Sequence, residues 1–262
     1  MERKTKAWIN AVVLAITLVI NWMGAVGVIN SLSQKEVSDM NPTLITPAPA
    51  TFSIWGVIYT LLILSVVVMI WKHKDSYYGQ AVDRISHLFW VSSALNVAWI
   101  VAFSYLQLGL STIFIAAFVI TLALILKELR AIHTGRDWLL PLAFGFYGGW
   151  LFIATVVNVA AWLVSIGWQG FGLADYVWGA IILLIAVGLT IGVLLQHRNA
   201  VFPLPIAWGY FGIYQVLVSP DGAAGQYGIM PAVTIVGLAV LVIAAVVQFI
   251  RNERSLFPAR AS

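Results

Sequence analysis

The sequence predicts an all-α membrane protein, a bundle of helices that cross the lipid bilayer. The first observation is composition: 61% of the residues are hydrophobic and 9% are charged, against roughly 45–50% and about 25% in soluble domains. The second is that apolar runs continue for about 20 residues, as a helix crossing ~30 Å of hydrocarbon requires. The third is that these runs lack the alternating pattern of membrane-barrel strands. Helices are therefore the structure in which the backbone N–H and C=O groups of this chain can all be hydrogen-bonded within lipid.

Apolar runs separated by prolines and charged loops predict eight membrane-spanning helices. They lie at about residues 8–30, 52–71, 86–105, 109–127, 139–163, 176–195, 202–218 and 230–250. The seventh span carries the weakest signal. Prolines fall before these helices or in their first turns, and none falls mid-helix, where proline is disfavoured. The residues between about 31 and 51 form the longest predicted loop.

Lysine and arginine predict the orientation, because cytoplasmic loops carry an excess of them. With the N-terminus inside, only Lys35 of the 14 Lys and Arg lies outside. An even number of spans keeps Arg251 and Arg254 inside, so both termini are expected in the cytoplasm. The start of the chain also resembles a secretory signal, with a cleavage-like Ala25-Val26-Gly27. Its apolar run exceeds the ~7–15 residues of a signal core, which favours a retained helix.

The spans contain almost no ionisable side chains, which proton pumps and ion-coupled transporters place at membrane depth. His87 and Asp175 lie only near helix ends, and the four histidines lack metal-ligand spacing. The absence of cysteine excludes disulfides, thiolate metal sites and cysteine nucleophiles. We therefore expect no catalytic residues and no metal site. The net charge of +4 is modest, and no nucleic-acid partner is expected.

Two spans each place aromatic and amide side chains on one helical face. On the fifth span this face covers roughly an 80° arc and comprises Tyr147, Trp150, Ala154 and Asn158. On the third span it covers a ~60° arc and comprises Asn96, Trp99 and Phe103. Asparagine in hydrocarbon needs a partner, so both faces should point inward, at each other or at a ligand. A packed helix interface without a ligand, in which the asparagines form the polar contacts between helices, explains the pattern equally well. Close-approach packing motifs occur at Gly145-x-x-x-Gly149 and Gly188-x-x-x-Gly192.

Three segments, in order along the chain, carry the motifs of a known family. The first is Thr46-Pro47-Ala48-Pro49 followed by Phe52-Ser53-Ile54-Trp55-Gly56-Val57-Ile58-Tyr59-Thr60. The second is Asn96-Val97-Ala98-Trp99 with Phe103 and Gly109, and the third is Tyr147-Gly148-Gly149-Trp150 with Ala154, Thr155 and Asn158. Together they resemble the tryptophan-rich sensory protein family, TspO/MBR, which includes the translocator protein or peripheral benzodiazepine receptor.

The resemblance covers roughly residues 7–163. It implies a five-helix unit, 1–163, and leaves 164–262 as a three-helix transmembrane extension. The family fold implies a pocket capped by the loop at 31–51 and lined by aromatic residues. Family members bind porphyrins and other flat, largely apolar ligands, and bacterial members are described as sensors of tetrapyrrole or stress state. The resemblance thus implies a multi-pass protein of a bacterial cytoplasmic membrane.

Two features depart from the family pattern. Some bacterial members are proposed to degrade porphyrin in light with one tryptophan on the second helix and one on the fifth. Trp150 matches the fifth-helix tryptophan, but the second-helix position is Tyr59. Animal members carry a sterol-recognition motif at the end of the fifth helix, and residues 156–170 contain neither Tyr nor Lys or Arg. The resemblance therefore implies no sterol site.

We expect a membrane sensor for a flat apolar ligand, and no bound cofactor unless the ligand itself is a porphyrin or haem-like molecule. The expected ligand-binding residues are Trp55, Tyr59, Asn96, Trp99, Phe103, Tyr147, Trp150, Ala154 and Asn158. The alternatives are an enzyme that oxidises tetrapyrroles in light, a carrier for an uncharged or amphipathic solute, and a purely structural bundle. The expected partners are the lipid bilayer, the small aromatic ligand and, as a further candidate, a second copy of the chain.

Overall fold

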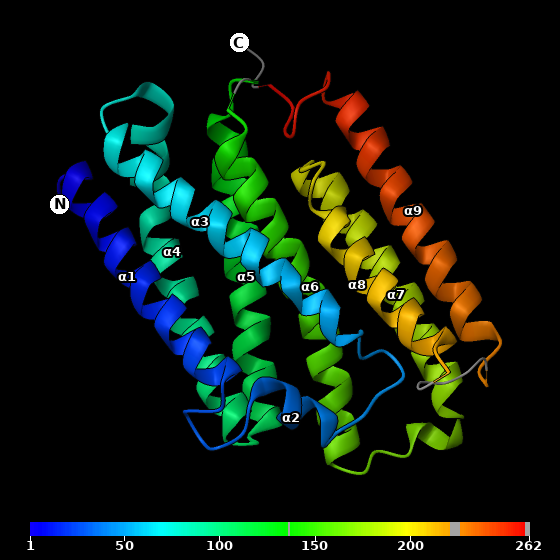
Figure 1. Ribbon diagram of the computed structural model, residues 1–262. Helices are drawn as coiled ribbons and strands as arrows, with labels where there is room; N and C mark the ends of the chain where they lie inside the picture. Colours follow the sequence, from blue (N-terminus) through cyan, green and yellow to red (C-terminus); the bar gives the residue numbers. More distant parts are fainter. Residues whose placement is uncertain (136, 221–225, 260–262) are drawn as a thin grey trace.

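The computed structural model describes residues 1–135, 137–220 and 226–259, and over these ranges the chain is helical without β-strands (Figure 1). The longer helices are α1 (Arg3–Ala25), α3 (Ile54–Trp71), α4 (Ser76–Ser104), α5 (Leu108–Ile132), α6 (Leu139–Ser165), α7 (Asp175–His197), α8 (Pro203–Val218) and α9 (Ile229–Arg251). Short elements occupy two connections: α2 (Gln34–Asp39), η1 (Pro49–Ser53) and η2 (Gly170–Gly172). The predicted all-α fold class is confirmed.

The eight predicted spans correspond in order to the eight longer helices. Among the described residues, seven helices are long and apolar enough to cross a membrane. The remaining one, α8, has 16 residues and a length of about 24 Å, short of the ~30 Å hydrocarbon core. The N-terminus and the end of α9 lie at the same end of the bundle (Figure 1), which we call the near end. That the near end faces the cytoplasm stays a prediction.

Helix α4 begins ten residues before the predicted start of the third span, because a cap extends it beyond the apolar run. The Asp75 carboxylate accepts from the backbone N–H groups of Tyr77 (2.9 Å) and Tyr78 (3.1 Å), as a helix N-cap does. Farther along this extension, Asp83 accepts from Arg3 (2.6 Å) and Lys6 (3.2 Å) of α1. A search for apolar runs cannot detect such a polar helical turn.

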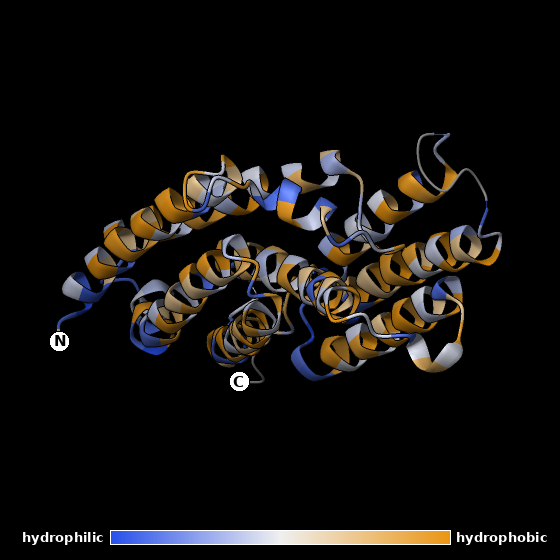
Figure 2. Cartoon of the chain, turned by 90° about the horizontal axis from the view of Figure 1, so that it is seen from below, coloured by the Kyte–Doolittle hydropathy of each residue, from blue (hydrophilic) through white to orange (hydrophobic). Residues whose placement is uncertain are grey.

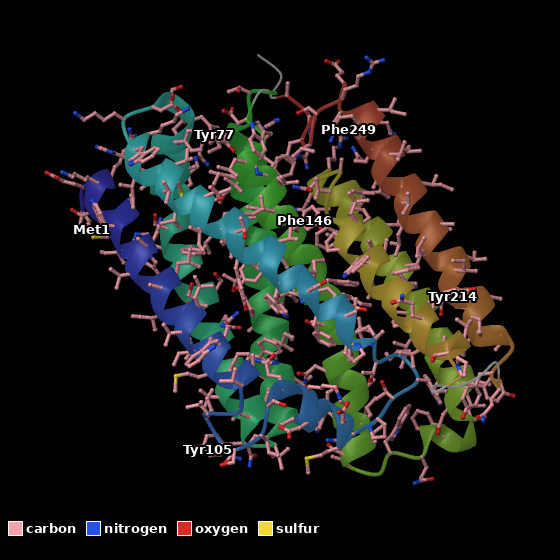
Figure 3. All side chains as sticks on the ribbon, viewed as in Figure 1. Met1, Tyr77, Tyr105, Phe146, Tyr214 and Phe249 are labelled. Atoms are coloured by element: carbon pink, nitrogen blue, oxygen red, sulfur yellow. The ribbon has the colours of Figure 1, made fainter. Side chains whose placement is uncertain are left out.

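The helices pack in two connected groups. In the first, α4 packs along α1 and α5, α5 packs along α6, and α3 crosses α1 and α6 (Figure 1). In the second, α8 packs between α6 and α9, and α7 packs along α9. Hydrophobic residues cover most of the helical surface, whereas hydrophilic residues concentrate near helix ends and in connections (Figure 2). The outward side chains along the helices carry few nitrogen or oxygen atoms (Figure 3), as contact with lipid requires.

The loop after α1 crosses the whole far end of the bundle and joins the two groups. We call residues 26–53 the strap. At its start Asn30 donates to the backbone oxygen of Ser104 on α4 (3.1 Å), and at its end the Ala48 N–H donates to the Gly212 oxygen on α8 (3.0 Å). Trp208 of α8 also donates its ring N–H to the Thr51 oxygen in η1 (2.8 Å). The strap therefore covers the end of the first group and contacts the second.

The seam between α6 and α8 depends on a glycine at close approach. A Cβ added at Gly149 would lie 2.2 Å from the backbone oxygen of Phe202 and 2.5 Å from Pro205, so Gly145-x-x-x-Gly149 does pack helices as expected. The packing role predicted for Gly188-x-x-x-Gly192 is wrong. At Gly188 and Gly192 a Cβ would meet nothing within 4 Å, and both lie on an exposed face of α7.

Residues 198–202 connect α7 to the short helix α8 without helical structure, and residues 199–202 are buried. The Asn199 side chain supplies hydrogen-bond partners that a helix would otherwise provide. Its oxygen accepts from the backbone N–H groups of Val201 (3.0 Å) and Phe202 (3.1 Å), and its nitrogen donates to the Pro141 backbone oxygen (2.9 Å). The segment after α9 packs on the connection between α7 and α8, where the Asn252 side chain donates to the Arg198 backbone oxygen (2.8 Å).

Candidate functional site

A chain of hydrogen bonds joins four helices in the middle of the first group. The Tyr59 hydroxyl on α3 donates to the Asn21 oxygen on α1 (2.9 Å), and the Asn21 nitrogen donates to the Asn96 oxygen on α4 (2.6 Å). The Asn96 nitrogen donates in turn to the Tyr147 hydroxyl on α6 (3.1 Å). Because a polar group in lipid must find a partner, these amides set the positions of all four helices relative to one another.

Aromatic rings from η1, α3 and α6 pack beside this chain. We call Phe52, Trp55, Tyr59, Tyr147 and Trp150 the inner aromatic cluster. Trp55 stacks on Tyr59 with ring centroids 5.1 Å apart, and its ring meets Tyr147 (6.2 Å) and Trp150 (6.3 Å) edge to face. Phe52 meets Trp150 edge to face at 5.8 Å. These are the favoured geometries of aromatic pairs, and the rings occupy the space they enclose.

Burial within the inner aromatic cluster is uneven. Trp150 is 2% exposed and Tyr147 is equally buried, whereas Trp55 and Tyr59 are half-buried and Phe52 is 43% exposed. The ring N–H of Trp150 is buried and has no hydrogen-bond partner among the described residues. A buried tryptophan N–H usually finds an acceptor. The cluster thus combines partly exposed rings on α3 with a buried Trp150 N–H that donates to no described residue.

A second polar group lies farther along α6. The Asn158 oxygen accepts from the Trp99 ring N–H (3.0 Å), and its nitrogen donates to Ser111 (3.0 Å) and Thr112 (2.7 Å) of α5. The ring centroid of Phe103 lies 6.2 Å from that of Trp99, and Phe103 belongs to one buried hydrophobic cluster with Leu108 and with Val37 of the strap. Here Asn158 of α6 bonds to both α4 and α5.

The predicted site residues therefore divide between two places. Trp55, Tyr59, Asn96, Tyr147 and Trp150 come together at the inner aromatic cluster and its hydrogen-bond chain. Trp99, Phe103 and Asn158 form the second group, and Ala154 lies half-buried between the two on α6. Trp99 and Trp150 are both buried in the bundle, so neither faces lipid. Asn96 and Asn158 bond to other side chains, in agreement with the packing role left open from the sequence.

Three participants were not singled out from the sequence: Asn21, Phe52 and Phe118, the last of which meets Tyr147 at 5.3 Å. Asn21 had a usable signal, because it is an amide inside an apolar run, as Asn96 is. Phe118 gives no such signal, because a phenylalanine in an apolar helix can face either lipid or the bundle interior. The contact of Phe52 depends on the path of the strap, which the sequence does not define.

The site carries no charge. The ion pairs of the described residues join Arg3 and Lys6 to Asp83, Lys35 to Asp39, and Arg84 to Glu128, all in connections or near helix ends. Within the described ranges there is also no group of three His, Asp or Glu that could hold a metal ion. The chemistry available at the inner aromatic cluster is therefore ring stacking and hydrogen bonding by neutral groups.

A shallow groove of about 330 Å³ lies elsewhere, between α8 and α9. Its lining is apolar and comprises Leu204, Ala207, Trp208, Phe211, Leu238 and Val242. With no convergent polar group it lacks the features that orient a ligand in a specific site. The inner aromatic cluster therefore remains the better candidate.

The comparisons with known proteins agree with the motifs and the helices. A family model described as TSPO-like protein matches residues 7–250, beyond the five-helix segment that carries the motifs. No curated protein and no solved structure matches the chain. With apolar helices of spanning length and a family match over almost all of its residues, this multi-pass integral membrane protein belongs to the TSPO-like protein family.

Proposed function

We propose that the protein is a membrane sensor that binds a flat, largely apolar ligand, such as a porphyrin, at the inner aromatic cluster. The observation that carries this proposal is the Trp150 ring N–H, a buried donor without an acceptor. Leaving such a group unpaired costs about 1–3 kcal/mol. A ligand that brings an acceptor atom to Trp150 recovers this free energy, and the surrounding rings offer faces on which its flat body can stack.

The ligand enters by displacing rings, because the cluster fills its own space. Phe52 and Trp55 are suited to move: both are partly exposed, and neither makes a side-chain hydrogen bond with another described residue. Tyr147 and Trp150 are buried and form the fixed wall. The lack of charge suits the apolar ring system of a porphyrin, and its carboxylates have to stay in water at the exposed edge of the cluster, because burying them unpaired would be costly.

Tyr59 provides the route by which binding becomes a signal. It stacks on Trp55 and also donates to Asn21, the first member of the chain through α1, α4 and α6. A ligand that shifts Trp55 therefore also shifts Tyr59, and loss of the Tyr59–Asn21 bond changes how four helices are joined. The sensing step is this rearrangement of helix contacts.

The test is titration of the purified protein in lipid nanodiscs with protoporphyrin IX, followed by quenching of tryptophan fluorescence. Trp150→Phe keeps a ring and removes the N–H, and we expect its affinity to fall by about 5–150-fold, equivalent to the ~1–3 kcal/mol recovered at this donor. A Tyr59→Ala, Trp150→Ala double variant should lose saturable binding. Trp71→Phe, which changes an exposed ring at the other end of α3, should bind as the unmodified protein does. Equal binding by the double variant contradicts the proposal.

Two further measurements separate binding from the alternatives. Under illumination, porphyrin absorbance that decays faster than in protein-free nanodiscs would indicate an oxidising enzyme. Substrate flux into sealed vesicles that saturates with porphyrin concentration would indicate a carrier. A sensor binds the porphyrin and gives neither result.

A further inference from the structure

The connection between α6 and α7 is apolar where a loop in water would be polar. We call residues 166–178 the outer aromatic loop. Its exposed residues include Ile166, Phe171, Leu173 and Tyr176, and Phe171 is 84% exposed. Between Asp137 and Arg198 the only charged residue is Asp175. The strap, at the same end of the bundle, instead exposes the Lys35–Asp39 pair on α2.

The outer aromatic loop has a defined conformation. Trp168, Phe171 and Trp178 contact one another, with ring centroids 4.9 Å apart for the two tryptophans and 5.5 Å apart for Trp168 and Phe171. The Trp178 ring N–H donates to the Gly170 oxygen (2.5 Å). A Cβ at Gly170 would lie 2.7 Å from the Trp178 ring. These contacts fix the loop against the first turns of α7.

The backbone of this loop is strained in a way that presents Phe171 outward. Phe171 has φ +52°, in the left-handed region that residues other than glycine, asparagine and aspartate avoid. Strained residues persist where surrounding contacts over-determine them, and they concentrate at binding and functional segments. Phe171 is also the most exposed large apolar side chain among the described residues, so this backbone conformation coincides with an outward-facing ring.

We propose that the outer aromatic loop is an interfacial anchor that inserts into the headgroup–acyl boundary of the leaflet at the far end. Tryptophan and tyrosine are enriched at this depth, because each has an apolar body and a polar edge. The exposed apolar surface continues from the loop onto the lipid-facing side of α6 at Val164 and of α7 at Leu184. This continuity and the lack of charge identify lipid as the partner.

Because the chain has no cysteine, single cysteines can report the depth of this loop. Leu173→Cys, which leaves all three rings intact, is labelled with the fluorophore NBD in phosphatidylcholine nanodiscs. Lys35→Cys on the strap is the matched control at the same end. The label at 173 should emit at shorter wavelength, be quenched by a lipid spin-labelled near the headgroup, and be protected from aqueous iodide several-fold relative to the label at 35.

A second variant tests the role of the loop conformation. Gly170→Ala in the Leu173→Cys background places a Cβ against Trp178, so iodide access at 173 should rise, whereas Gly188→Ala, in open space, should leave it unchanged. Iodide quenching at 173 as strong as at 35 in the parent protein overturns the proposal. Protection found in native membranes and lost in pure lipid also overturns it, in favour of a protein partner.

Discussion

The two helix groups are held together by different kinds of contact. In the group of α1 and α3–α6, side-chain amides and hydroxyls bond across helices, through Asn21, Asn96 and Asn158. In the group of α7–α9, the buried hydroxyls of Thr190 and Thr234 bond to their own helix, and Tyr210 of α8 donates to the Leu183 backbone oxygen of α7 (2.5 Å). Contact there depends on small residues, as at Gly237 beneath the Tyr210 ring. Amide and hydroxyl side chains of different helices bond to one another in the first group, where the candidate ligand site lies.

The largest expected effect is at the seam between the groups. Gly149→Ala places a Cβ against the backbone oxygen of Phe202, 2.2 Å away in the unmodified geometry, so α6 and α8 must separate. We expect a loss of about 3 kcal/mol in unfolding free energy, measured by denaturant titration in detergent. Gly188→Ala, with open space at its Cβ, is the matched control and should be nearly neutral. Equal stabilities would show that the seam is not close-packed.

The second effect concerns the non-helical connection to α8. Asn199→Ala removes the partners of two backbone N–H groups and of the Pro141 oxygen. Buried backbone groups left without partners should cost about 2–3 kcal/mol in unfolding free energy. Gln196→Ala, at an exposed neighbouring position, should change it little. If the two variants unfold alike, water or lipid already satisfies this backbone.

The third effect compares the groups directly. Asn158→Ala leaves Trp99, Ser111 and Thr112 without their shared partner, and should cost about 2 kcal/mol, since bonds between helices in membranes average ~0.6 kcal/mol each. Thr190→Ala, equally buried but bonded only within α7, should cost less than about 1 kcal/mol. Comparable losses in thermal unfolding would remove the distinction between the groups.

The smallest effect is local and depends on pH. His133 is buried against Phe257 and contacts Ser255 (3.0 Å) in the segment after α9. Burial lowers the pKa of His133, and Asp137 opposes this only in part. When residues 252–257 pack on His133, the buried imidazole binds fewer protons than it does when the segment is detached. The packed form is therefore fully favoured above the ordinary histidine pKa of about 6.5, and it becomes less stable as pH falls below that value. Hydrogen exchange at residues 252–257, corrected for its intrinsic pH dependence, should accelerate below that pH. His133→Phe should remove the acceleration.

The sequence predicts most of the helices because lipid imposes a simple requirement on length and hydropathy. It also predicts the inward faces of Asn96, Trp99, Tyr147 and Trp150, since an amide in an apolar helix must find a partner. It does not predict the start of α4, which depends on the Asp75 cap, or the division of the site into two groups. That division follows from which neighbours supply partners, because α1 and α3 bond into the chain at Asn96 and Tyr147 whereas α5 bonds to Asn158.

The contacts between the strap and α8 form only late in synthesis. Thr51 and Trp208 bond across 157 residues of sequence, so the strap emerges from the ribosome long before α8. At roughly 5–20 residues per second, about 8–31 s of translation separate the two partners. During that interval the end of the strap lacks the two bonds that α8 later makes to Ala48 and Thr51.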